Sequence, residues 1–221
     1  EEKRKIIGRE FIRSFEKDDR GPLRKLCADT AFMGEPVEKF CPDRELFADW
    51  ACSYYTDYEP ESIFVAEYEN QLCGYVMGAK DESRYRKASA ELSRPCLNRA
   101  LGRLLFEPSS RRLLLSLVKS FMSGEFKRPD FSRHYPAHLH INVDKAFRGS
   151  GIGSMLMNRF EDYLRSSKVY GARLATISAR ANRFFQKQGF GILYRRRVTY
   201  FDYLAQEEIY LSMYGKTLER G

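Results

Sequence analysis

The chain has 221 residues, a formal net charge of +8 and 43% hydrophobic residues. This length suits one domain, or one domain with a large insertion, and the apolar content is sufficient for a buried core. No run of 18 apolar residues occurs, so the sequence predicts no membrane span and we expect no membrane partner. The five cysteines are odd in number and form no Cys-x-x-Cys pair, which favours reduced thiols in the cytoplasm over disulfides or a metal site.

The positive charge is unevenly distributed. Residues 163–201 contain nine Lys or Arg and no Asp or Glu. Such a field favours a polyanionic cofactor, although a solvated basic face and a nucleic-acid surface produce the same pattern. Because no nucleic-acid recognition motif accompanies the charge, we expect no nucleic-acid partner.

The first third of the chain alternates between strand and helix signals. Residues 9–16 predict a first strand, which is followed by a helix that ends near residue 29. Pro42 starts a second helix with an apolar side. Residues 62–68 and 71–79 predict two strands joined by a two-residue turn, which indicates a hairpin.

Residues 81–135 then predict a helical insertion between the third and fourth strands. Helical spacing of apolar residues is present over residues 97–105 and again over 114–121, with Pro108 between them. We consider three roles for these helices: covering one mouth of a site, forming a homodimer face, or packing on the core without a function.

The remaining residues predict a parallel crossover followed by an antiparallel end of the sheet. Residues 137–143 predict the fourth strand, 150–167 an amphipathic helix and 172–177 the fifth strand. A short helix over residues 180–188 and two strands near 190–200 and 206–214 complete the chain.

A glycine-rich turn connects the fourth strand to the amphipathic helix. Residues 148–153 read Arg-Gly-Ser-Gly-Ile-Gly. Glycines allow a tight turn, and the first N–H groups of a helix form a site for phosphate. The Walker loop requires Lys after its last Gly, and the dinucleotide fingerprint requires Gly at Ser154, so both fail here. A tight turn with no ligand remains an alternative.

The pattern that remains, Arg-x-x-Gly-x-Gly after a strand, resembles the acyl-CoA pyrophosphate loop of the GCN5-related N-acetyltransferase (GNAT) family. A second segment, residues 178–190, is similar to the family pattern Asn-x-x-Ala-x-x-Phe-Tyr-x-Lys-x-Gly-Phe. Ser178 stands in place of the Asn and Phe185 in place of the Tyr. The resemblance is sharp over residues 137–192, looser over 8–79 and absent from 81–135. Residues 135–141 also look similar to the acetyltransferase-like domain associated with O-GlcNAc hydrolases and their bacterial relatives.

The resemblance implies a mixed α/β (α+β) fold. Its twisted sheet would be mostly antiparallel, with a splayed parallel pair formed by the fourth and fifth strands and with flanking helices. Residues 1–221 would then form a single acyl-CoA N-acyltransferase domain that includes the insertion at about 81–135.

The resemblance also implies direct transfer of an acetyl group from acetyl-CoA to a primary amine, on a small molecule or a peptide, without a metal. The expected cofactor-binding residues are Ile141, Val143, Arg148, Gly149, Ser150, Gly151, Ile152, Gly153, Ser154, Ser178, Arg180, Phe184, Phe185 and Lys187. Arg148 would either contact phosphate or shape the turn. The alternative function is a non-catalytic acyl-CoA-binding or scaffold module.

Two histidines on the fourth strand, His138 and His140, are the candidate general bases, because a pKa near 7 suits proton removal from an amine. They share a strand face with Asn142. A bulge is typical of this strand in the family and would reverse their direction. The alternative is a histidine that is hydrogen-bonded under the inserted helices.

The general acid and the acceptor site are less constrained. In many family members the Tyr of the second segment protonates the departing thiolate, and Phe185 is unable to do so. Either another tyrosine (Tyr194, Tyr200 or Tyr203) or water takes this role, or the protein binds without efficient transfer. Trp50, Tyr54 and Asn142 are the candidate substrate contacts, with ordinary packing of the second helix as the alternative for the two aromatic residues.

Overall fold

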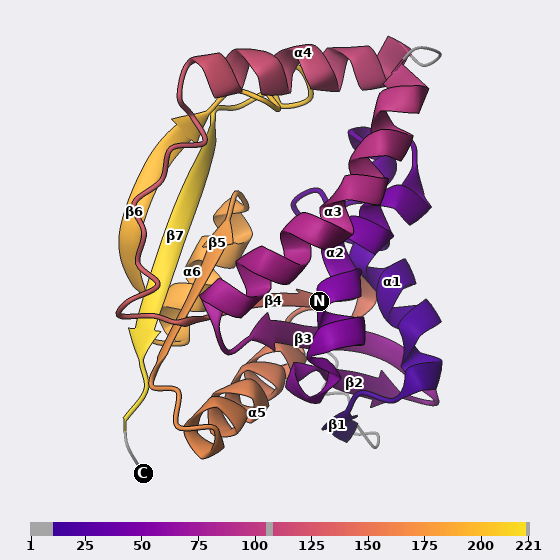
Figure 1. The fold of residues 1–221 in the computed structure, drawn as a ribbon. Helices are drawn as coiled ribbons and strands as arrows, with labels where there is room; N and C mark the ends of the chain where they lie inside the picture. The colour runs from indigo at the N-terminus through magenta and orange to yellow at the C-terminus, as the bar shows by residue number, and fades with distance from the viewer. Residues whose placement is uncertain (1–10, 105–107, 220–221) are drawn as a thin grey trace.

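The structure, a computed structural model, describes residues 11–104 and 108–219. Seven strands of this part of the chain form one sheet in the order β1-β2-β3-β4-β5-β7-β6 (Figure 1). The strands are β1 (Phe11–Ser14), β2 (Phe64–Tyr68), β3 (Gln71–Ala79), β4 (Ala137–Val143), β5 (Gly171–Thr176), β6 (Gly191–Val198) and β7 (Ile209–Thr217). The helices are α1 (Arg20–Asp29), α2 (Arg44–Tyr58), α3 (Glu82–Leu104), α4 (Pro108–Met122), α5 (Ile152–Ser166) and α6 (Ala179–Lys187).

The pair β4–β5 is parallel, and the other neighbouring pairs of the sheet are antiparallel. Pairing between β4 and β5 is limited to Ala137 with Ala172 and His138 with Arg173. Beyond these two pairs the strands separate, although β4 continues to Val143 and β5 to Thr176. The predicted mixed sheet with a splayed parallel pair is therefore confirmed.

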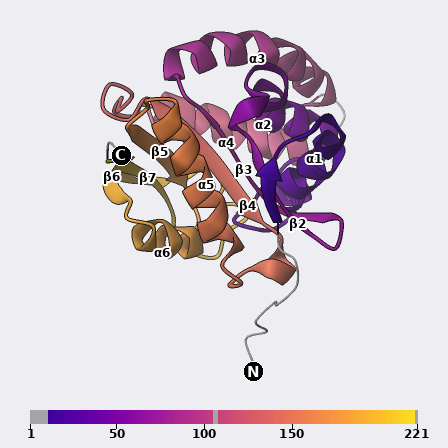
Figure 2. The same cartoon turned by 90° about the horizontal axis from the view of Figure 1, so that it is seen from below.

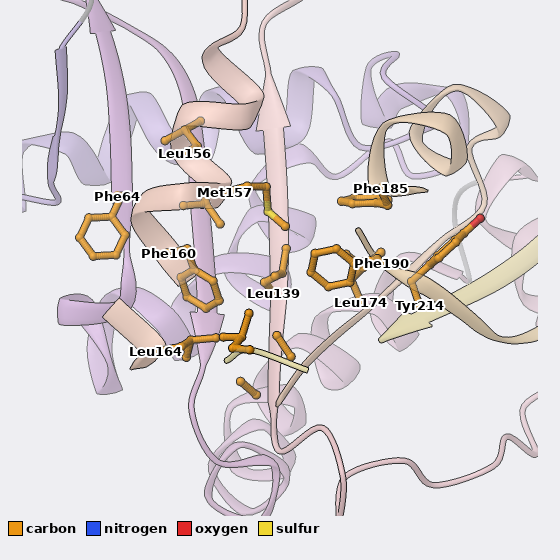
Figure 3. Packing of buried hydrophobic residues seen from close by; sticks show 14 of the residues in the cluster. Phe64, Leu139, Leu156, Met157, Phe160, Leu164, Leu174, Phe185, Phe190 and Tyr214 are labelled. Atoms are coloured by element: carbon orange, nitrogen blue, oxygen red, sulfur yellow. The ribbon is translucent and has the colours of Figure 1, made fainter. Parts of the chain in front are cut away.

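Helices cover both faces of the sheet. The helices α1, α2 and the start of α3 pack on one face, and α5 packs on the other (Figure 2). The core under α5 is formed by Leu156, Phe160 and Leu164, which recur every four residues and are fully buried (Figure 3). Gly78 of β3 permits this close packing, because a Cβ there would lie 2.3 Å from the Phe160 ring.

The insertion forms the two helices α3 and α4, as predicted, but α3 starts about 15 residues earlier than the apolar spacing indicated. The early turns of α3 are polar apart from a narrow stripe that includes Tyr85, Ala88 and Leu92, which pack on the core of the α1/α2 face. Tertiary contact thus defines a helix that periodicity alone does not. In the described residues, no helix is long and apolar enough to cross a bilayer.

Candidate functional site

A cavity of about 750 Å³ opens where β4 and β5 diverge. Its lining comes from both strands, from the turn before α5, from the start of α6 and from the loop after α1. The sequence-predicted residues on its wall are His140, Ile141, Asn142, Val143, Arg148, Gly149, Gly151, Gly153, Ser154, Ser178, Arg180, Phe184 and Phe185. Residues from two distant parts of the chain therefore meet at one cavity.

The glycine-rich turn presents backbone to this cavity. Gly149 and Gly151 have φ angles of 87° and 104°, a left-handed conformation that favours glycine. Gly151 is the N-cap of α5, and Ser154 N–H returns a hydrogen bond to its carbonyl. A Cβ on Gly149 or Gly151 would meet no atom within 4 Å, so both glycines border open space. The turn therefore forms a cradle at the positive end of a helix.

Two residues of this turn point elsewhere. The Ser150 hydroxyl donates to the Phe147 carbonyl, 2.8 Å away, and Ile152 is buried in the core under α5. Neither side chain lines the cavity, so any contact they make with a ligand there is through their backbone.

Arg148 connects the turn to the loop after α1. Its Nε donates to the Val143 carbonyl at 3.1 Å and its Nη2 donates to the Gly34 carbonyl at 3.0 Å. Burial, followed by the charge of Arg180, lowers its pKa. The guanidinium shapes the cavity wall by these two bonds, which is one of the roles expected for it.

The start of α6 forms the neighbouring wall. Ser178 is the N-cap of this helix and accepts a hydrogen bond from Ala181 N–H at 3.4 Å. The Phe184 ring lies beside Gly153, where a Cβ would come within 3.3 Å of it. Phe185 is 6% exposed and packs beside Phe190 in the core. Lys187 is exposed and is not part of the lining.

The direction of the β4 side chains follows from a regular strand. The β3–β4 register runs without a shift from Gly74 with Val143 to Ala79 with His138, so the bulge typical of the family is not present here. Leu139 lies in the core under α5. His138, His140 and Asn142 therefore face the side of α1 and α2.

His138 is held under the inserted helix. Its Nε2 lies 2.9 Å from the Tyr55 hydroxyl, its Nδ1 lies 3.0 Å from Glu82 Oε2, and the Tyr85 ring packs on it. The cavity lining does not include it. This geometry matches the alternative of a hydrogen-bonded histidine under α3.

Glu82 joins β4 to β5 at the point where they begin to diverge. Besides His138, its carboxylate binds Arg173 of β5 at 2.6 Å. Burial opposes ionisation, but hydrogen bonds from His138 and Arg86 and the charge of Arg173 outweigh it and lower the Glu82 pKa to about 2. The first turn of the insertion is thus fixed to the base of the site.

His140 is the histidine on the cavity wall. Its side chain is exposed and borders the open cavity. Partial desolvation beside the protein wall, followed by the charge of the nearby His138, lowers the pKa of His140, so the imidazole is neutral at pH 7. Asn142, also on the wall, donates from Nδ2 to the Tyr75 hydroxyl at 2.8 Å.

The two aromatic residues expected to contact substrate lie away from the cavity. Trp50 is 62% exposed and packs beside Phe47, and Tyr54 is buried with its hydroxyl donating to Glu59 at 2.9 Å. The structure therefore favours ordinary packing of α2 over substrate contact at this cavity. The polar group of Tyr54 is already hydrogen-bonded to Glu59 inside the α1/α2 layer, so it is not available to a substrate in the cavity.

Several lining residues were not predicted. Thr30, Ala31, Met33 and Gly34 form a wall from the loop after α1, and this wall is extended by Thr176 of β5, by Ile177 directly after it and by Leu211 of β7. No sequence motif marks them, because only the packing of this loop against the sheet brings them together.

The three tyrosines considered as the general acid, Tyr194, Tyr200 and Tyr203, do not line the cavity. Within residues 11–104 and 108–219, no cluster of three His, Cys, Asp or Glu is present that would hold a metal ion.

Comparisons with known proteins agree with this geometry. Residues 123–192 match a family model described as an acetyltransferase (GNAT) domain, which confirms the resemblance seen in the sequence and the expectation of an acetyltransferase. The match covers β4, α5, β5 and α6, and therefore the glycine-rich turn and much of the cavity.

Three solved structures share the fold. SsHAT is 24% identical, with a TM-score of 0.69 over 94% of this chain and 98% of its own. The Drosophila melanogaster polyamine N-acetyltransferase, described as forming N-acetylagmatine, is 17% identical, with a TM-score of 0.61 over 95% and 100%. The yncA protein of Salmonella typhimurium, solved with its cofactor acetyl-CoA, is 13% identical, with a TM-score of 0.57 over 97% and 96%. At these identities the likeness concerns the fold.

Proposed function

We propose that this chain is a member of the GCN5-related N-acetyltransferase family that transfers an acetyl group from acetyl-CoA to the primary amine of a small molecule. The observation that carries the proposal is the cavity between the diverging ends of β4 and β5, with the glycine-rich turn at its edge. Two neighbours of the same fold support it: one contains acetyl-CoA and another forms an N-acetylated amine.

The cofactor fits the residues present. The pyrophosphate would lie on the backbone N–H groups of residues 149–154, where left-handed glycines leave open space at the positive end of α5. Arg180 would add a cation on the α6 side. The pantetheine would lie between β4 and β5, where backbone groups beyond the His138–Arg173 pair no longer form a ladder with the neighbouring strand.

The reaction that these residues support starts with attack of the amine nitrogen on the thioester carbonyl. Backbone N–H groups of β4 near Ile141 would stabilise the oxyanion. As the C–N bond forms, the nitrogen becomes acidic, and the neutral His140 imidazole on the same wall accepts its proton. We assign His140 as the base and His138 as a positioning residue, because His138 is held by Tyr55 and Glu82.

Departure of the thiolate does not use the residue found in many family members. Phe185 carries no proton, and its ring is buried. Tyr194, Tyr200 and Tyr203 lie outside the cavity lining. We therefore assign protonation of the thiolate to water, which reaches the open cavity.

A second candidate function is binding of acyl-CoA without transfer. Phe185 and Ser178 favour it, because both depart from the family pattern at the cavity wall. A binding module would show saturable affinity for acetyl-CoA but no thiol release that depends on an amine.

Calorimetric titration with acetyl-CoA tests the site. We expect micromolar binding to the wild type and loss of at least a hundredfold in Gly151→Glu, which adds strain and a negative charge to the cradle. Gly124→Glu is the matched control, because Gly124 also has a positive φ (73°) but lies outside the cavity lining. No binding to the wild type, or equal losses in both variants, would overturn the site. Thiol release with an amine panel then separates transfer from binding.

A further inference from the structure

On the α1/α2 side, the side chains that line the cavity are neutral apart from the Arg148 guanidinium, which is hydrogen-bonded to the Gly34 carbonyl of this wall. Thr30, Ala31 and Met33 contribute from the loop after α1, Ile177 contributes from the residue after β5, and Leu211 contributes from β7. His140 and Asn142 complete this wall from β4, and His140 is uncharged at pH 7.

This wall is the acceptor side of the cavity if the proposed function holds. The glycine-rich turn and α6 lie with α5 on the opposite face of the sheet, where the cofactor phosphates would bind (Figure 2). Since the candidate base His140 projects toward the α1/α2 face, the attacking amine must approach from there.

Behind the wall lies an aromatic cluster. The Phe201 ring lies 5.2 Å from the ring of Phe32 and 5.2 Å from the ring of Phe40. Met33, Ile177 and Leu211 belong to the same apolar cluster and also line the cavity. The surface available to the non-reacting part of an acceptor is therefore apolar.

The charged side chains in the lining are cations. Arg148 and Arg180 both border the cavity, and burial followed by the charge of Arg180 lowers the Arg148 pKa. Two carboxylates near the wall in sequence are engaged elsewhere: Asp29 binds Lys25 at 2.8 Å, and Glu35 lies 3.7 Å from Lys145. An ammonium or guanidinium group on this wall would lie near the Arg148 and Arg180 cations, and the described lining residues include no carboxylate to pair with it, which is unfavourable.

We infer that the acceptor is a primary amine with an apolar, uncharged remainder, and that it enters the site as the neutral amine. The inference rests on the proposed function and specifies its substrate class. A second cation, as in a diamine or a guanidine-bearing amine, would find no carboxylate to pair with among the described residues that line this wall. The acceptor preference would then differ from that of the Drosophila melanogaster neighbour despite the shared fold.

The transfer forms one C–N bond, breaks one C–S bond and moves one proton from nitrogen to sulfur by way of His140 and water. The amine lone pair forms the C–N bond, the C–S bond of the thioester breaks, and its electron pair leaves with the thiolate. His140 takes the proton from nitrogen and returns it to water, and water protonates the thiolate. The products are the N-acetylamide and free coenzyme A.

The experiment compares phenethylamine with agmatine as acceptors for the wild type, with free thiol as the readout. We expect kcat/KM to be at least tenfold higher for phenethylamine at the same pH. The rising limb of its pH profile should also move when an amine of lower pKa replaces phenethylamine, because the neutral amine is the form that binds. Equal rates, or a preference for agmatine, would overturn the inference while leaving the proposed function intact. If acetyl-CoA binds but none of the amines tested causes release of free thiol, the proposed function itself is overturned.

Two variants test the wall directly. Asn142→Asp replaces the amide nitrogen of the side chain by an oxygen and so puts a carboxylate on the β4 part of the wall. Met33→Glu adds a carboxylate at a half-buried position of the loop after α1. We expect either to shift the kcat/KM ratio at least tenfold toward agmatine, whereas Met33→Gln, the uncharged control, should not. If Asn142→Asp fails to fold, the kcat/KM ratio measured for Met33→Glu still tests the inference. An unchanged ratio in a folded Met33→Glu variant would overturn the inference.

Discussion

The cofactor half of the molecule, from β4 to α6, and the inserted arm, formed by α3 and α4, use helices in opposite ways. In the cofactor half, α5 buries Leu156, Phe160 and Leu164 completely against the sheet. In the arm, α4 leaves Leu115, Phe121 and Met122 between 68% and 82% exposed. The two helices have similar apolar patterns in the sequence, so the pattern predicts a helix but does not identify what covers it.

The arm itself has two different ends. At its start, Glu82 is fixed between His138 and Arg173 where β4 and β5 diverge. At its far end, α4 contacts the rest of the protein through residues such as Leu117, in the aromatic cluster, and Ser120, near Thr199. We therefore expect substitutions at the start of the arm to affect the site, and substitutions on the exposed face of α4 to have little effect on the fold.

The largest expected effect is on stability in the cofactor half. Phe160→Ala should lower the free energy of unfolding by about 3 to 5 kcal/mol, because it removes a fully buried ring and leaves a cavity. Phe121→Ala in α4 is the matched control and should cost less than about 0.5 kcal/mol. Denaturant unfolding measures both, and similar losses in the two variants would remove the contrast between the regions.

Glu82→Gln should lower the free energy of unfolding by about 3 kcal/mol at pH 7, because it leaves the buried Arg173 without its carboxylate partner. The folded-state pKa of Glu82 lies below its unfolded value, so its contribution is complete above about pH 4.5 and is lost as the pH falls toward 2. The wild type should therefore lose stability across this window, and Glu82→Gln should lose less. Glu91→Gln, an exposed glutamate of the same helix, should keep the wild-type slope.

His140→Gln should lower kcat about a hundredfold, the low end of the usual contribution of a general base, and leave acetyl-CoA affinity unchanged. His134→Gln, on an exposed loop outside the cavity lining, is the control and should retain activity. Steady-state kinetics and calorimetry on both variants measure the two quantities. Full activity in His140→Gln would exclude it as the base.

The smallest effect is expected for the double variant Leu115→Ser and Met122→Ser. Because both side chains are largely exposed, the free energy of unfolding should change by less than about 0.5 kcal/mol. Sedimentation at several concentrations tests the homodimer face considered for the insertion: a dimer through α4 would dissociate at higher concentration in the variant than in the wild type.

The sequence by itself determined much of the cofactor half. The order strand, glycine-rich turn and amphipathic helix is local, and Gly149 and Gly151 adopt the left-handed conformations that such a turn requires. The family pattern over residues 178–190 correctly identified a second helix start, and both lie at one cavity. The strand alternation of His138, His140 and Asn142 was also predictable, but its direction was not, because a single bulge would have reversed it.

Only the tertiary structure decided which histidine faces the cavity and what forms the opposite wall. Both histidines lie on the same face of β4, and they differ because Glu82 and Tyr55, distant in sequence, occupy the space around His138. The neutral wall from Thr30 to Gly34 has no motif, since its position depends on the packing of a loop against β7 and on the Arg148–Gly34 hydrogen bond. Local patterns encode backbone conformation and periodicity, whereas the neighbours of a side chain are set by contacts across the fold.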